Sequence, residues 1–241
     1  MSFTKSNIAW IDTETNGLDA SKNSLLEIAV IVTDCELNVL DEVGFHAVVR
    51  YELPRAQELY DQAVPFVQDM HTKTGLWHRL SEVDALPRFV VDRDLRDYLQ
   101  HFGEPGTMPV AGNTVRLDMN FMDANLPTTA KFLDYHMRDV STVAGFANDW
   151  YDLPWFQKKS DHTAMVDIRE SIREIKHYRE AVFRNAAEDK ALTAAYDAAL
   201  YMPQGTMTAE QWTVFAALCN AAEQIVTRVE SHGTITVSET Q

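Results

Sequence analysis

The chain has 241 residues and a formal net charge of −15, and 46% of its residues are hydrophobic and 24% charged. These values are typical of a soluble globular protein with one sizeable core, and they argue against a broad grip on long nucleic acid, which depends on Lys and Arg. Two cysteines without framework or ligand spacing, and no signal peptide or membrane span, lead us to expect a cytoplasmic protein.

The first half of the chain predicts three strands followed by helices. Apolar runs separated by turn residues predict an antiparallel meander, with strands at 8–14, 25–34 and 42–50. From about residue 54 the pattern becomes helical, and it predicts two short helices broken near Pro65. A longer amphipathic helix is predicted over 82–102.

The second half predicts two more strand–helix pairs and an appendage. A short buried strand at 108–113 precedes a helix from about 116, and a strand beginning at 134 leads into a helix capped by Ser141 or Thr142. Apolar residues at helical spacing predict another helix over 161–183. We therefore expect an α/β domain over residues 1–184, with 185–241 forming an appended C-terminal helical hairpin.

Two carboxylates follow the first apolar run, Asp12 and Glu14, only one residue apart. Side chains alternate along a strand, so both should point the same way with their carboxylates a few ångströms apart. Like charges held this close raise each other's pKa unless a cation lies between them. On this segment alone two explanations remain open, a metal site or a strand that ends in solvent with Asn16-Gly17 as a hairpin turn.

Three later residues supply further possible ligands. Asp118 falls in the first turns of a predicted helix, and His162 precedes Asp167 by five residues at the start of another. Each has an ordinary structural explanation, such as an acid that complements a helix dipole. Together with the first pair they provide four carboxylates and one imidazole, which suits phosphodiester hydrolysis with two divalent ions, Mg²⁺ or Mn²⁺. Imidazole also suits proton acceptance near neutral pH.

This order of residues resembles the DEDDh exonucleases and, within them, the oligoribonucleases. Across residues 8–183 the matching segments are IAWIDTETNGLD, LLEIAVIVTD, MHTKTGL, AGNTVRLDMNFM, YHMRDVST and HTAMVDIRESIREIKHYREAVF. The resemblance implies a ribonuclease H-like mixed sheet flanked by helices, a homodimer, and 3′→5′ degradation of short oligonucleotides with two divalent ions. It implies that His162 is the general base and that the metal ligands are Asp12, Glu14, Asp118 and Asp167.

The resemblance also implies a set of substrate-binding residues. Leu18 would wedge between two bases, and His71 would line the base pocket. Tyr135 and Ser141 lie in the stretch that, in the family, closes around the substrate's 5′ end, partly from the partner subunit. The remaining members of the set are Thr13, Phe66, Thr114 and His136.

Three of these positions depart from the family pattern. Phe66 replaces a Trp, Thr114 replaces a Ser, and His136 stands where the family usually has an Arg that caps the 5′ phosphate. The change at His136 predicts weaker discrimination between dinucleotides and longer chains, because Arg grips a phosphate with two parallel hydrogen bonds.

Three functions are compatible with these features. We favour a metal-dependent 3′→5′ exonuclease that acts on short single-stranded oligonucleotides, RNA rather than DNA. The alternatives are a DEDDh exonuclease for longer single-stranded DNA in repair or proofreading, and a catalytically silent binding module with the nuclease fold. The complete set of carboxylates argues against the silent module, because clustered carboxylates repel one another without metal.

Overall fold

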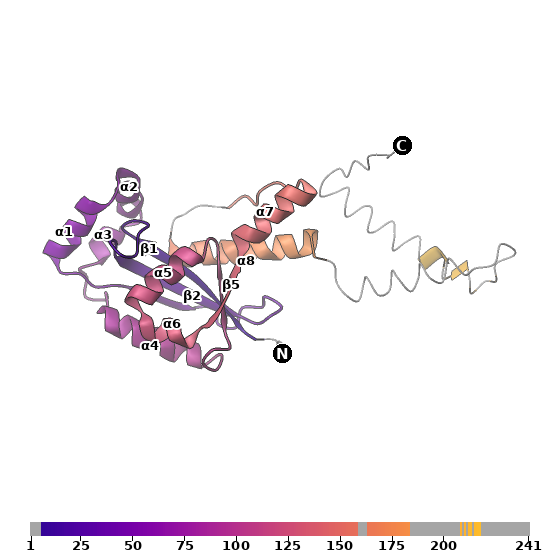
Figure 1. Cartoon of the computed structure of the whole chain (residues 1–241), viewed down its shortest axis with the longest axis horizontal. Coiled ribbons are helices and arrows are strands. Elements are labelled where there is room, and N and C mark those ends of the chain that lie inside the picture. Colours follow the sequence, from indigo (N-terminus) through magenta and orange to yellow (C-terminus); the bar gives the residue numbers. More distant parts are fainter. Residues whose placement is uncertain are drawn as a thin grey trace. The chain divides into compact units, whose positions relative to one another are not determined.

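The computed structural model describes residues 6–158, 163–183, 208, 210, 212–213 and 215–217. Its centre is a five-stranded sheet with the strand order β3-β2-β1-β4-β5 (Figure 1). The strands are β1 (Ile8–Thr15), β2 (Leu25–Thr33), β3 (Phe45–Val48), β4 (Pro109–Gly112) and β5 (Asp134–Asp139). The helices are α1 (Leu53–Gln62), α2 (Pro65–Lys73), α3 (Leu76–Arg79), α4 (Arg88–Gln100), α5 (Arg116–Asn125), α6 (Pro127–Phe132), α7 (Val140–Tyr151) and α8 (Ala164–Ala181).

The sheet is mixed, as the sequence predicted. β1, β2 and β3 pair antiparallel in succession, which confirms the predicted meander. β4 then pairs parallel with β1, and β5 pairs parallel with β4. The chain returns to the sheet through helices, because parallel neighbours need a crossover connection.

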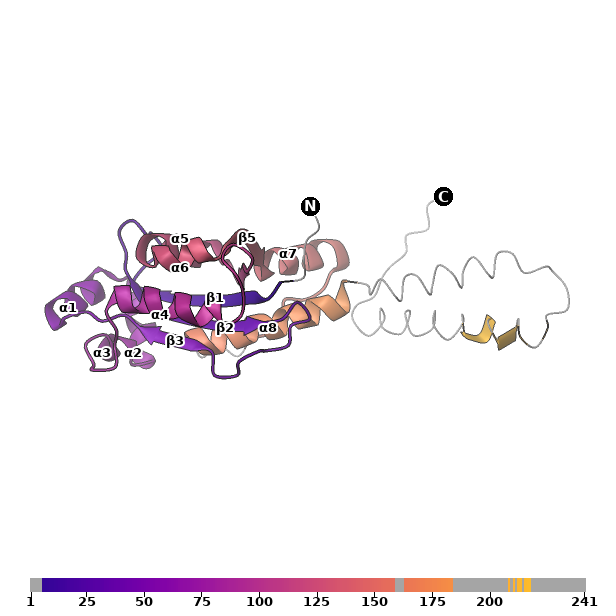
Figure 2. The ribbon, with the colours of Figure 1, turned by 90° about the horizontal axis from the view of Figure 1, so that it is seen from below.

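The two faces of the sheet carry separate hydrophobic clusters. Ala9 and Ile11 of β1 pack in a cluster with residues of α4, α5 and α6. Ile8 and Trp10 pack on the opposite face with Ala164 and other residues of α8. Figure 2 shows α5 and α6 on one side of the sheet and α8 on the other. Because side chains alternate along a strand, the residues after Trp10 at the same spacing also face α8.

The chain divides into two compact units. The first, Met1–Val143 with Gln157–Ile175, contains the whole sheet, and the second contains Ala144–Phe156 and Lys176–Gln241. Within the second unit the Phe156 amide donates to the Tyr178 hydroxyl at 3.2 Å. The predicted boundary at residue 184 and the predicted hairpin over 185–241 lie almost wholly outside the described residues, so both stay predictions. Among the helices that the structure describes, none has the length and apolar character needed to cross a bilayer.

Three predicted helix starts were wrong. The helix predicted over 161–183 is α8, which begins at Ala164, after the non-helical Thr163. The helix predicted over 82–102 begins only at Arg88, because Leu86 bridges to Val49 beside β3 and Pro87 then precedes the first turn. α7 begins at Val140, so Ser141 lies inside the helix and does not cap it. Asp139, the last residue of β5, accepts the Ser141 amide at 2.9 Å and takes the capping role. The short helices α3 and α6 were not predicted.

Candidate active site

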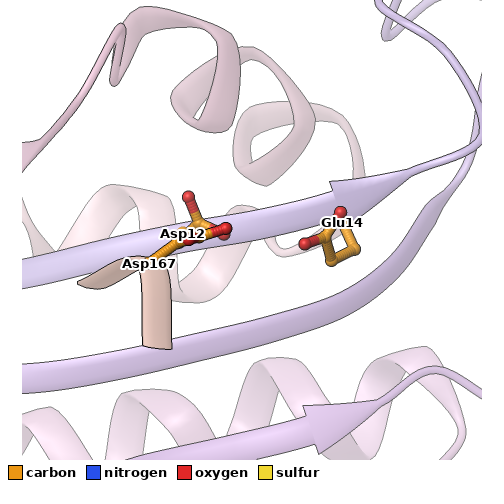
Figure 3. A group of neighbouring side chains, drawn as sticks. All are labelled: Asp12, Glu14 and Asp167. Carbon is orange, nitrogen blue, oxygen red and sulfur yellow. The ribbon is translucent and has the colours of Figure 1, made fainter. Parts of the chain in front are cut away.

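Three carboxylates converge where β1 meets the start of α8. Asp12 and Glu14 extend from the α8-facing side of β1, and Asp167 lies in the first turn of α8. One oxygen of each carboxylate lies within 4.8 Å of the others (Figure 3). Because side chains alternate along β1, Asp12 and Glu14 point the same way, as the sequence predicted, and both lie close to Asp167.

Asp118 approaches the same strand from α5. Its carboxylate is buried, and Oδ1 accepts the Thr13 amide at 2.9 Å and the Thr13 hydroxyl at 2.7 Å. Thr13 stands between Asp12 and Glu14, and its side chain points to the other face of the strand. Asp118 is therefore held beside the group of three carboxylates through Thr13.

Burial and neighbouring negative charges raise the pKa values of three of these acids, Asp12, Glu14 and Asp118. Burial raises the pKa of Asp12 well above its ordinary value, with further contributions from Asp118, Glu14 and Asp167. Burial, followed by the charge of Glu27, raises the pKa of Glu14 to about 8. Burial raises the pKa of Asp118 to about 6, although the two Thr13 donors lower it. A bound cation would offset this repulsion.

Glu27 is a buried carboxylate that sequence reasoning missed. It pairs with Glu14 across β1 and β2. Its Oε1 accepts Arg79 Nη1 at 3.1 Å and lies 2.5 Å from His46 Nε2. The signal was present in LLEIAVIVT, where one acid interrupts a run of otherwise apolar strand residues. A buried acid in such a strand requires partners, and these come from α3 and β3.

The predicted substrate-binding residues of the second half form two small groups. The Thr114 amide donates to Ser141 Oγ at 3.0 Å and to Asp139 Oδ1 at 3.2 Å, which joins the β4–α5 connection to the start of α7. On β5, the Tyr135 and His136 rings lie with centroids 3.9 Å apart, and Tyr135 is 84% exposed.

The predicted substrate-binding residues of the first half differ in exposure. Leu18, in the β1–β2 connection, and Phe66, at the start of α2, present large apolar side chains to solvent. His71 of α2 is fully buried, with Nε2 3.0 Å from the Thr15 carbonyl and 3.8 Å from Glu14 Oε2. His162 lies outside the described residues.

Sequence comparisons identify the family. The sequence profile of the RNase T exonuclease family matches residues 9–175. Over 181 residues the chain is 39% identical to the oligoribonuclease of Streptomyces coelicolor, an alignment that covers 73% of this chain and 86% of the relative. The oligoribonuclease of Dichelobacter nodosus is 34% identical over 181 residues, which cover 75% of this chain and 97% of that protein. The chain belongs to the oligoribonuclease family of exonucleases.

Solved exonuclease structures share the fold of this family member. Exonuclease I from Methylocaldum szegediense superimposes with a TM-score of 0.56 at 16% identity, over 81% of this chain and 46% of that one. A zinc-bound complex of E. coli exonuclease I with single-stranded DNA gives a TM-score of 0.53 at 14% identity, over 83% of this chain and 46% of that one. The chain thus spans about half the length of these two structures. They confirm the predicted ribonuclease H-like sheet flanked by helices.

Proposed function

We propose that this chain is a 3′→5′ exoribonuclease that degrades short single-stranded oligonucleotides to nucleoside 5′-monophosphates. The observation that carries the proposal is the convergence of three carboxylates, from Asp12, Glu14 and Asp167, in a member of the oligoribonuclease family. Carboxylate oxygens are hard donors, which divalent metal ions prefer in phosphodiester hydrolases.

The donor set fits two divalent ions, Mg²⁺ or Mn²⁺. All the proposed ligands are carboxylates, and the raised pKa values of Asp12, Glu14 and Asp118 mark a site where added positive charge is favourable. The residues that would hold the ions are Asp12, Glu14, Asp118 and Asp167. When bound, such ions activate water and stabilise charge on the leaving oxygen.

In the proposed reaction His162 accepts the proton of the water that attacks the terminal phosphodiester. The bond from phosphorus to the preceding 3′ oxygen breaks, that oxygen takes up a proton, and a nucleoside 5′-monophosphate leaves. Imidazole is suited to this proton transfer because it can exchange protons near neutral pH. Thr13 contributes indirectly, since its two donors orient the carboxylate of Asp118.

Side chains around the site suit a short, single-stranded substrate. Exposed Leu18 and Phe66 can contact unstacked bases, which apolar and aromatic groups bind without reading their sequence. We place the substrate's 5′ end near Thr114, Ser141 and His136, and assign a base-pocket role to His71. The net charge of −15 favours short over long substrates, because little of the surface can neutralise phosphates.

Hydrolysis of 5′-labelled RNA and DNA of graded lengths, with Mg²⁺ or with EDTA, tests this function. We expect stepwise loss of nucleotides from the 3′ end of short RNA, metal dependence, and loss of activity in Asp167→Ala. We expect His162→Ala to lose rate while keeping metal and substrate affinity. Faster hydrolysis of long single-stranded DNA would favour the repair or proofreading alternative, and wild-type turnover in excess chelator would refute the metal-dependent reaction.

We further propose that the protein is a homodimer and that residues 185–241 form an extension separate from catalysis. The exposed ring of Tyr135 is compatible with a role across a subunit interface. Deletion of 185–241 should leave turnover per folded molecule unchanged, and sedimentation of both proteins reports the oligomeric state. Lost turnover in a folded truncated protein would contradict the proposal that residues 185–241 are separate from catalysis. A cytoplasmic location stays a prediction.

A further inference from the structure

Asn113 directly follows β4 and precedes Thr114, one of the proposed 5′-end residues, and the proposed function gives it no role. Its side chain is partly buried and bonds to two helices. On α8, Asn113 Nδ2 donates to Ser171 Oγ at 2.8 Å and to Glu174 Oε2 at 3.0 Å. On α7, its Oδ1 accepts the Ser141 hydroxyl at 3.0 Å. One short side chain thus joins the end of β4 to both helices.

The two partners on α8 fix which way the Asn113 amide faces. Glu174 offers a buried carboxylate, which accepts hydrogen bonds and donates none. Ser171 Oγ donates its single hydrogen to the Asp167 carbonyl at 2.9 Å, so toward Asn113 it also acts as an acceptor. Both partners therefore require the NH2 group of Asn113, and the amide oxygen must face Ser141.

The amide oxygen of Asn113 in turn orients Ser141. Because Ser141 has one hydroxyl hydrogen and Asn113 Oδ1 accepts it, only the lone pairs of Ser141 Oγ are left for other partners. These lone pairs face Thr114, whose amide donates to Ser141 Oγ at 3.0 Å and whose hydroxyl oxygen lies 3.3 Å away. The direction of the hydrogen bonds is thus set from α8 through Asn113 and Ser141 to Thr114.

Thr114 depends on such support because its backbone is strained. Its φ is +54°, in the left-handed region that β-branched residues rarely adopt, and such conformations persist only where the surrounding structure holds them. The Thr114 amide is held by two acceptors, Ser141 Oγ and, at 3.2 Å, Asp139 Oδ1. The Thr114 side chain is exposed and so can be reached by a substrate.

We propose that Asn113 is a positioning residue for the substrate's 5′ end. It holds Ser141, and through it Thr114, in the arrangement that receives a terminal 5′ phosphate, and it attaches that arrangement to the helix that carries Asp167. This inference rests on the placement of the 5′ end in the proposed function. It assigns Asn113 no contact with substrate or metal, so its loss should weaken recognition of the 5′ phosphate and leave hydrolysis itself intact.

The loss of Asn113 has two consequences of opposite sign. Asn113 Oδ1 competes with a phosphate for the Ser141 hydrogen, so its removal frees one donor. Water replaces the lost acceptor, and the gain is therefore smaller than a full hydrogen bond. Removal also lets Ser141 and the strained Thr114 relax into other conformations, which the substrate must then order at a cost in affinity. We therefore expect a net loss of 5′-phosphate recognition.

Two dinucleotides that differ only in the 5′ phosphate, pApA and ApA, test this inference. We expect wild type to have the higher kcat/KM for pApA. Asn113→Ala should lower kcat/KM for pApA by about tenfold, the value of one hydrogen bond to a charged group, with little change for ApA. The matched control is Asn7→Ala, which removes a 2.7 Å hydrogen bond to the Phe102 carbonyl and should change neither value.

A double-mutant cycle with Ser141→Ala tests whether Asn113 acts through Ser141. In the Ser141→Ala background, Asn113→Ala should cause little further loss of kcat/KM for pApA. A further tenfold loss in that background would overturn the inference. It would also be overturned if Asn113→Ala lowered kcat/KM equally for pApA and ApA, or for neither. A wild type that does not distinguish pApA from ApA would refute the placement of the 5′ end in the proposed function, and this inference with it.

Loss of folding in Asn113→Ala is addressed by a second variant. Ser171→Ala removes one of the two acceptors of Asn113 Nδ2 and keeps Glu174, so Asn113 is held less firmly. Circular dichroism and thermal unfolding verify that this variant is folded. We expect kcat/KM for pApA to fall by about threefold, with the value for ApA unchanged, because one neutral hydrogen bond is lost. If Asn113→Ala does not fold, an unchanged ratio of the two values in folded Ser171→Ala would overturn the proposal.

Discussion

Glu14 and Glu27 lie directly opposite each other on β1 and β2, and both are buried. Like charges in such cross-strand pairs destabilise a sheet. Arg79 and His46 contact Glu27 at 3.1 and 2.5 Å, whereas the basic side chain nearest to Glu14 among these pairs, His71, lies 3.8 Å away. Glu14 is left with a pKa of about 8, raised by burial and by the charge of Glu27.

The raised pKa predicts that the metal-free protein is more stable at pH 6 than at pH 8. Between the ordinary pKa of 4.5 and about 8, the folded state holds a proton on Glu14 that the unfolded chain has released. Stability is then lost as pH rises through this range, by up to about 1.4 kcal/mol per pH unit for one proton. Urea unfolding in EDTA measures this slope, and Glu14→Gln should reduce it. Stability that increases from pH 6 to pH 8 would contradict the prediction.

We predict that loss of the hydrogen bond from the Thr13 hydroxyl to Asp118 raises the Mn²⁺ concentration that the reaction requires. Thr13→Val removes the hydroxyl donor and keeps the backbone donor, so burial should raise the pKa of Asp118 further. We expect a higher Mn²⁺ requirement at pH 7, which falls back toward the wild-type value at pH 8.5. Asp118→Ala should cost more, about 3 kcal/mol or a hundredfold in rate.

Thr107→Val provides the control for this measurement. The Thr107 hydroxyl donates to the Glu104 carbonyl on an exposed turn, so its loss removes a similar hydrogen bond away from the carboxylates. The rate is measured as a function of Mn²⁺ concentration at pH 7 and pH 8.5 for wild type, Thr13→Val and Thr107→Val. Identical metal requirements for Thr13→Val and Thr107→Val would mean that the Thr13 hydroxyl does not influence Asp118.

His136 predicts a broad preference for substrate length. Its amide and Nδ1 both contact Asp134 Oδ1, at 3.0 and 2.9 Å. His136→Arg should shift kcat/KM toward dinucleotides by about 1–2 kcal/mol, because a charged, bidentate donor grips a 5′ phosphate more strongly. Substrates of two, three, five and ten nucleotides give the profile.

The neighbouring acid requires a second variant in this experiment. Asp134 can form an ion pair with an Arg introduced at 136 and so hold it away from the phosphate. Asp134→Asn combined with His136→Arg removes that competition and should give the larger shift toward dinucleotides. If neither variant changes the length profile, residue 136 does not face the 5′ phosphate.

A buried cap between α4 and α6 predicts a loss of stability without a loss of catalysis. Asp92 accepts the amides of Thr128 and Thr129 at 3.1 and 2.8 Å, and the Thr129 hydroxyl at 2.9 Å. Burial raises its pKa, but these donors outweigh burial and hold the pKa below the ordinary value of 3.8. The stabilisation is therefore present above that value and is lost as pH falls below it.

Asp92→Ala should lower the free energy of unfolding by about 2 kcal/mol at pH 7, because it leaves backbone donors of α6 without their acceptor. Turnover of the folded variant should equal that of wild type. Asp94→Ala, which removes an exposed partner of Arg93 on the same helix, should have little effect. Equal unfolding midpoints for the two variants would contradict the capping role.

The sequence predicted those features that depend on local periodicity. The alternation in β1 gave both the strand and the common direction of Asp12 and Glu14, because a period of two leaves no choice of face. The sequence did not predict that Asp139 both ends β5 and caps α7, because the local pattern favours Ser141 or Thr142 as the cap. The contact of Asp118 with Thr13 joins residues 105 positions apart and has no local signature. α6 has six residues, too few to show a helical period.

The backbone at Thr114 has a consequence for selection experiments. Thr114 adopts φ +54°, a conformation that is strained for a β-branched residue, while its amide bonds to Ser141 and Asp139. In a library with all residues at this position, selection for thermal survival should enrich Gly and Asn, which relieve about 1 kcal/mol of strain. Selection for cell growth that depends on the enzyme's activity should keep Ser and Thr, because their hydroxyl groups can contact the Ser141 hydroxyl. The two enriched pools should diverge at this codon.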